Sequence, residues 1–250
     1  MLPPGSGTVL NVATILIGSG LGVLVGHRLP ERTRSTVTDA LGLMTLVLGG
    51  LNVADGLGSA DYVAAVGSSA TVLIVLGALL IGGIVGSLAR IEDRLARGGA
   101  VLKRRLTRTG GAAGHDRFVE GYVTASLVFL IGPLAILGSL SDGLGRGIDQ
   151  LALKSTLDGF ASIAFAASFG WGVAAAALSV AALQGLLTVA GVLVGDLLPV
   201  SYVDATTATG GVLLLGVGLR LLAVKQVPVG DLLPALVVAP VLVALIVPLR

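Results

Sequence analysis

Positive charge is separated from apolar sequence along this chain, and that separation limits the folds open to it. Eight of the 16 Lys and Arg residues lie in one stretch, residues 90–117. Most of the remaining chain is Leu, Val, Ala, Ile and Gly, in runs long enough to cross a bilayer. Because basic loops resist translocation, this pattern predicts an all-α, polytopic bundle of transmembrane helices.

The composition agrees with a membrane domain and leaves little sequence for anything else. Only 12% of the residues are charged, where a soluble domain has about a quarter. We therefore expect a single transmembrane domain over residues 1–250. The absence of cysteine excludes disulfides, thiolate metal sites and a cysteine nucleophile. The 38 glycines suit helices whose backbones approach closely.

The apolar runs predict about eight spans. The run 118–140 contains Gly132–Pro133, where a kink is expected because proline lacks an N–H. The run 157–195 is too long for one span and should divide near Gly170–Gly172; if it does not divide, the count is seven. The predicted spans are 8–26, 37–54, 70–89, 118–140, two within 157–195, 206–223 and 232–249.

The positions of the basic residues predict an orientation for these spans. Eight spans with both termini outside place thirteen of the 16 Lys and Arg residues in the cytoplasm. The first charges follow the first apolar run, so that run should stay in the membrane as an uncleaved span. The loop 90–117 is expected to be a solvated cytoplasmic connector; the alternative is a binding site for anionic lipid headgroups.

An internal repeat is indicated by matching segments near the two ends of the chain. Gly22, Gly26 and Pro30 match Gly191, Gly195 and Pro199 at a constant offset of 169. After a one-residue gap, residues 39–42 continue onto 207–210, and 50–52 onto 218–220. The predicted topology makes the two copies inverted, a design that recurs in transporters. The alternative is that Gly- and Leu-rich helices resemble one another by composition.

Asp158 is the most informative polar residue, because a charge at membrane depth is costly. Ser155 and Ser162 lie three and four residues away from it on the same helical face, and hydroxyls beside a carboxylate suit Na⁺ binding or proton transfer. The other interpretation is a capping box, in which Ser155 and Asp158 close a helix start and Lys154 neutralises the acid at the outer surface.

Several uncharged polar residues are further candidates for an interior substrate or ion site. For each of them an interhelical hydrogen bond is the simpler role. They are Asn11, Thr124, Ser126 and Gln184. The sequence contains no nucleotide-binding loop, catalytic triad or metal-ligand cluster, so we expect no enzyme, no cofactor and no metal site.

Five segments resemble a family of bacterial membrane proteins of unknown function, DUF554. They are the opening run to residue 32, the central blocks 121–144 and 151–173, and the closing segments near 208–219 and 231–240. The resemblance carries over Lys154, Ser155, Asp158 and Gly159 as a KSxLDG element, and Gln184–Gly185 as a QG element. Where family members often have Gly-Asp, this chain reads Gly147-Ile148-Asp149. The resemblance implies the bacterial plasma membrane.

Three functions remain open at the level of sequence. The first is a small secondary transporter or ion-coupled carrier of a small solute or ion, with an interior site between spans 1, 4, 5 and 6. The second is a non-transporting scaffold that binds a partner or anionic lipid through the 90–117 loop. The third is a passive channel. Gly-xxx-Gly faces on several spans are also compatible with a homodimer, and nothing points to nucleic acid.

Overall fold

The computed structural model describes residues 3–26, 30–94, 97, 112–130, 133–194 and 199–249. All regular structure in these residues is helical, which confirms the predicted fold class. Contacts divide the chain into two compact units. Most of the basic 90–117 loop lies outside the described residues.

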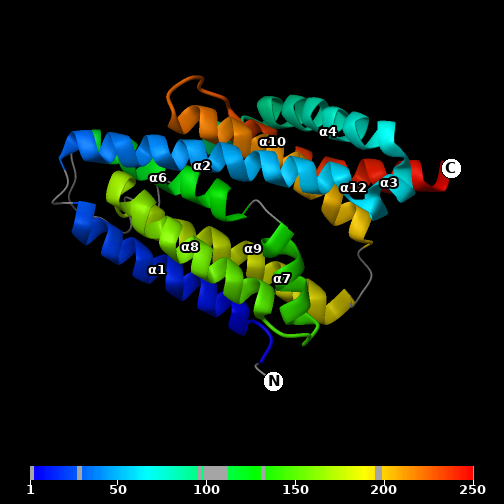
Figure 1. Cartoon of the computed structure of the whole chain (residues 1–250), viewed down its shortest axis with the longest axis horizontal. Helices are drawn as coiled ribbons and strands as arrows, with labels where there is room; N and C mark the ends of the chain where they lie inside the picture. Colours follow the sequence, from blue (N-terminus) through cyan, green and yellow to red (C-terminus); the bar gives the residue numbers. More distant parts are fainter. Residues whose placement is uncertain are drawn as a thin grey trace. The chain divides into compact units, whose positions relative to one another are not determined.

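Unit 1 consists of helices from the start and the middle of the chain, labelled in Figure 1. They are α1 (Ser6–Gly26), α6 (Ala112–Leu130), α7 (Pro133–Gly143), α8 (Asp149–Phe169) and α9 (Gly172–Val194).

Helices α1 and α8 lie side by side and parallel, with almost no space between their backbones (Figure 1). A Cβ on Gly18 would lie 2.3 Å from the carbonyl oxygen of Gly159. One turn further along each helix, a Cβ on Gly22 would lie 2.2 Å from the oxygen of Ile163. Only glycine permits this approach, so the Gly-xxx-Gly row of α1 sets its alignment with α8.

The predicted kink within the run 118–140 is confirmed, and it is sharp; residues 131–132 lie outside the described residues. The segments Arg117–Leu130 and Leu134–Gly143 meet at 81°. Proline at the first position of α7 is well placed, because its missing N–H would have no partner within the helix there. Together α6 and α7 run from the α8–α9 turn, where Gly172 meets the carbonyl of Phe118, to the first residues of α1.

The predicted division of the run 157–195 near Gly170–Gly172 is also confirmed. Helix α8 ends at Phe169 and α9 begins at Gly172. Gly170 closes α8 with a φ of 75°, a left-handed conformation that glycine adopts at little cost. The tight turn makes α9 antiparallel to α8, and therefore antiparallel to α1.

Unit 2 is built from the helices that follow α1 and α9 in the chain, beginning within α2 at Gly42. Its core includes the fully buried Tyr62 and Ala78. Its elements are α2 (Glu31–Gly58), α3 (Ala60–Val66), α4 (Ser68–Ala89), α10 (Val200–Leu221), α11 (Val229–Leu232), α12 (Ala235–Ile246) and the 3₁₀ turn η1 (Val247–Leu249). Residues 55–69, which the sequence places between the predicted spans 37–54 and 70–89, are thus mostly helical, because α2 extends to Gly58 and α3 follows it.

By length and composition, six of the described helices can cross a membrane, or seven if α6 and α7 form one broken span. The prediction of a membrane protein with several spans is confirmed, with six or seven candidate spans among the described residues. Helix α8 has the length of a span, but its charged and hydroxyl residues lower its hydropathy. It also buries Lys154, Asp158 and its three serines, and it exposes Leu153, Leu157 and Phe160 (55–71% exposed). A helix with its polar residues buried and its apolar residues exposed is suited to lipid surroundings.

Candidate functional site

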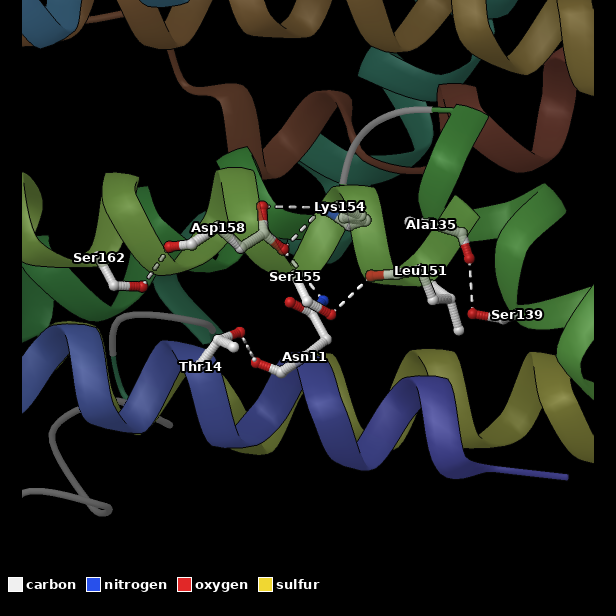
Figure 2. Close-up of polar contacts among 9 residues, drawn as sticks. All are labelled: Asn11, Thr14, Ala135, Ser139, Leu151, Lys154, Ser155, Asp158 and Ser162. Carbon is white, nitrogen blue, oxygen red and sulfur yellow. Dashed lines mark hydrogen bonds and ion pairs between the residues drawn. The ribbon is translucent and has the colours of Figure 1, made fainter. Parts of the chain in front are cut away.

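The inner face of α8 carries a buried ion pair between Lys154 and Asp158 (Figure 2). The Lys154 ammonium lies 2.8 Å from one carboxylate oxygen of Asp158 and 3.0 Å from the other. The two side chains are only 8% and 9% exposed. Their spacing of four residues places them on adjacent turns of one helical face. The pair brings two opposite charges, and no net charge, into the interior of unit 1.

Asn11 of α1 completes this cluster from the neighbouring helix. Its side-chain nitrogen donates at 3.0 Å to Oδ2 of Asp158, the carboxylate oxygen that lies 2.8 Å from Lys154, across 147 residues of sequence (Figure 2). The contact is possible because the Gly18 and Gly22 row holds α1 directly against α8. Asn11 is fully buried, and its side-chain oxygen has no partner within the described chain.

The capping-box interpretation of Ser155 and Asp158 is wrong. Helix α8 begins at Asp149, so Asp158 lies more than two turns inside the helix. Nor do the flanking hydroxyls turn to the carboxylate: Ser155 donates to the carbonyl of Leu151 and Ser162 donates to the carbonyl of Asp158, both at 2.6 Å. Each serine thus donates to a backbone carbonyl of its own helix, whereas Lys154 and Asn11 donate to the carboxylate.

Gln184 on α9 is fully buried, and neither its side-chain nitrogen nor its oxygen has a partner in the described residues. One turn further along α9, the Thr188 hydroxyl lies 3.4 Å from the hydroxyl of Thr8 on α1. Helices α1 and α9 are antiparallel. The step of one turn from Thr8 forward to Asn11 along α1 therefore runs in the same direction as the step of one turn from Thr188 back to Gln184 along α9. Gln184 therefore lies at the level of Asn11 within unit 1.

Thr124 and Ser126 are buried on α6, but Ser126 belongs to a different polar group. The Ser179 hydroxyl of α9 lies 3.3 Å from Ser126 and 2.9 Å from the Tyr122 hydroxyl. These contacts are the interhelical hydrogen bonds that the simpler role predicted for Ser126. Among the described residues, no hydrogen bond links Thr124 to Asn11, Lys154 or Asp158.

Two features of the site went beyond the sequence reasoning. Lys154 is a buried partner of Asp158 rather than a surface counter-charge, although the four-residue spacing is visible in the sequence. Asp142 of α7 was not singled out: one of its carboxylate oxygens accepts the backbone N–H groups of Gly5 and Gly7, each at 3.1 Å. A carboxylate at a helix N-terminus is favoured by the helix dipole. Asp142 thereby fixes the start of α1.

The described residues contain no group of three or more His, Cys, Asp or Glu side chains that could hold a metal ion. The cluster consists instead of one internal ion pair, one hydrogen bond that the Asn11 amide donates, and carboxamide atoms that have no hydrogen-bond partner among the described residues. In membrane proteins, ionisable and polar groups of this kind occur in substrate sites and proton relays.

The fold and this interior cluster define a class, the polytopic helical membrane proteins with ionisable residues inside the bundle. The chain belongs to a family within that class, described as a protein of unknown function (DUF554), whose model matches residues 6–244. This result confirms the resemblance seen in the sequence.

Two relatives span nearly the same length as this chain. The "Uncharacterized protein YqgA" of Escherichia coli (strain K12) is 31% identical over 233 residues, which are 93% of this chain and 94% of the relative. The "Uncharacterized membrane protein YdfK" of Bacillus subtilis (strain 168) is 28% identical over 240 residues, 96% of each chain. No solved structure matches the chain.

Proposed function

We propose that this protein is a small secondary transporter, or ion-coupled carrier, of the bacterial plasma membrane. The observation that carries the proposal is the Lys154–Asp158 ion pair, held by Asn11 inside unit 1. Buried ionisable groups in membrane helices are costly, and in transporters they form substrate sites and proton relays. A purely structural role is a weak explanation, because well-packed apolar residues would stabilise a bundle at least as well.

We propose further that α8 and the bent α6–α7 pair both cross the membrane, which gives eight crossings. Helix α8 runs parallel to α1 along three turns of close contact, so if α1 crosses, α8 crosses in the same direction. Helices α6 and α7 connect the two ends of unit 1 and so amount to one broken span. With the basic 90–117 loop in the cytoplasm, both termini then lie outside.

Packing in unit 2 supports the inverted repeat. A Cβ on Gly211 of α10 would lie 2.7 Å from the carbonyl oxygen of Gly49 on α2, and one on Gly218 would lie 3.0 Å from that of Gly42. The offset of 169 seen between α1 and α9 converts Gly42 into Gly211 and Gly49 into Gly218. If a two-fold axis exchanges α2 and α10, the contact between Gly49 and Gly211 becomes the contact between Gly218 and Gly42. This correspondence does not need the one-residue gap in the sequence match.

An inverted repeat and a neutral interior site fit an alternating-access cycle. When a proton or another cation binds the Asp158 carboxylate, Lys154 loses its partner and must move or lose its own proton. A change of charge at the site is thereby linked to a change in helix contacts. This linkage is what couples solute movement to an ion gradient.

Uptake into proteoliposomes tests the proposal. Purified protein is reconstituted under a pH or Na⁺ gradient, and entry of labelled small solutes is measured for the wild type, Asp158→Asn and Asp149→Asn. Asp149 is exposed in the first turn of the same helix, so its variant is the matched control. We expect gradient-dependent uptake that Asp158→Asn abolishes and Asp149→Asn retains. Full activity in Asp158→Asn would remove the acid from the mechanism, and uptake without any gradient would indicate a passive channel.

A second candidate is a scaffold that works through the basic connector, and one contact favours it. At the described start of the connector, Glu92 accepts hydrogen bonds from Arg220 of α10 and, at 2.8 Å, from the N–H of Gly230. The base of the connector is thus fixed to unit 2. Deletion of residues 98–111 would abolish the cellular role of a scaffold, while Asp158→Asn would leave that role intact.

A further inference from the structure

Three carboxamide atoms inside unit 1 have no hydrogen-bond partner in the described protein. They are the side-chain oxygen of Asn11 and both the oxygen and the nitrogen of Gln184. Both residues are 0% exposed. Buried polar groups in folded proteins almost always have partners. Two carboxamides at the same level, beside an ion pair, therefore indicate a partner that comes from outside the chain.

The charge of the cluster restricts that partner. Lys154 and Asp158 neutralise each other, and the unused atoms of Asn11 and Gln184 are uncharged acceptors and one donor group. A ligand with net charge would leave that charge uncompensated at membrane depth. A ligand without net charge that both donates and accepts hydrogen bonds satisfies all three atoms at no electrostatic cost.

We propose that Asn11 and Gln184 form a water-connected binding site for a small polar solute that carries no net charge. The proposal rests on the transport function for its biological purpose, since it names the class of solute carried. The Lys154–Asp158 pair adjoins the site through the hydrogen bond that Asn11 donates to Asp158.

The same side chains indicate the end from which the site is reached. In the first turn of α1, one turn before Asn11, the hydroxyl of Thr8 lies 3.4 Å from that of Thr188. In the other direction, beyond Asp158, α8 carries Phe165 and Phe169. The ring of Phe165 contacts Phe129 of α6 edge-on at 6.2 Å and stacks on Phe169 at 6.3 Å. Polar solutes should therefore enter from the N-terminal end of α1.

The chain has no cysteine, so a single introduced thiol can test access directly. In membrane vesicles, Gln184→Cys is treated with three water-soluble methanethiosulfonates: the uncharged hydroxyethyl, the cationic trimethylammonioethyl and the anionic sulfonatoethyl reagents. Modification is followed by mass spectrometry. We expect the uncharged reagent to react at least tenfold faster than either charged one.

Leu186→Cys is the matched control, because Leu186 lies on the same helix and is 67% exposed on the apolar surface. A thiol there faces hydrocarbon, where thiolate does not form, and should react with none of the reagents. Thr188→Cys is a second position on the route, expected to react as Gln184→Cys does, and it keeps the test decisive if one variant does not fold.

Two results would overturn the inference. If the thiols at positions 184 and 188 react no faster than the one at 186, no water-connected site exists. If charged and uncharged reagents react equally fast, the site does not select solutes without net charge. Neither result depends on uptake, so failure of this inference and failure of the transport proposal are distinguishable.

Discussion

Removing one member of the Lys154–Asp158 pair should destabilise the protein more than removing both. At 2.8 Å, two unit charges attract by about 6 kcal/mol at an effective dielectric constant of 20. Desolvation of each ion costs several kcal/mol and offsets most of that attraction. In Lys154→Met the carboxylate keeps its desolvation cost and retains only Asn11 as a donor. We expect the free energy of unfolding to fall by about 3–5 kcal/mol.

The double variant Lys154→Met/Asp158→Leu removes both buried charges and should recover most of that loss. Asp149→Asn, an exposed acid on the same helix, should stay within about 0.5 kcal/mol of the wild type. Unfolding is measured by circular dichroism in mixed micelles with a rising mole fraction of sodium dodecyl sulfate. The reasoning is refuted if the single variants have small effects that add in the double variant within about 0.5 kcal/mol.

Three further variants test the packing. Gly22→Ala should lower the free energy of unfolding in mixed micelles by about 1–3 kcal/mol, because its Cβ would meet a backbone oxygen of α8 at 2.2 Å. Gly20→Ala, with nothing within 4 Å of its Cβ, should leave it unchanged in the same assay. Phe165→Ala should cost about 3–5 kcal/mol in mixed-micelle unfolding, since it empties a fully packed ring position; a cost near zero would show that the aromatic cluster is loosely packed. Glu92→Gln should lower the free energy of unfolding by about 1 kcal/mol, a value discounted for partial exposure. In a double-mutant cycle, Arg220→Met should add little to that loss. Additive losses would disprove the contact.

Much of the fold could be predicted from the sequence because each decision was local. The helix lengths, the break at Gly132–Pro133 and the division at Gly170 depend on hydropathy and on backbone chemistry within a few residues. Errors arose where polar residues lie inside helices. The segments 55–69 and 141–156, which lie between predicted spans, both contain helix, because a short polar segment can remain helical when its neighbours pack against it.

The candidate site shows the same division between local and non-local information. Asp158 was found from the sequence alone, because an acid in an apolar run is costly wherever that run folds. Its capping role was wrong, since the sequence did not reveal that α8 begins at Asp149. Asn11 could be named as a polar candidate, but its bond to Asp158 spans 147 residues and depends on how two helices meet.

The sequence by itself therefore determined that this protein is a helical membrane protein, which family it belongs to, and which acid is exceptional. Those properties depend on residues that are close together in the sequence, because each membrane helix satisfies its backbone hydrogen bonds within itself. Only the tertiary structure decided that Lys154 is buried against Asp158, that Asn11 joins them, and that Gln184 lies at their level. Glycine rows allow backbones to touch, and the helix alignment that follows from those contacts brings distant polar groups together.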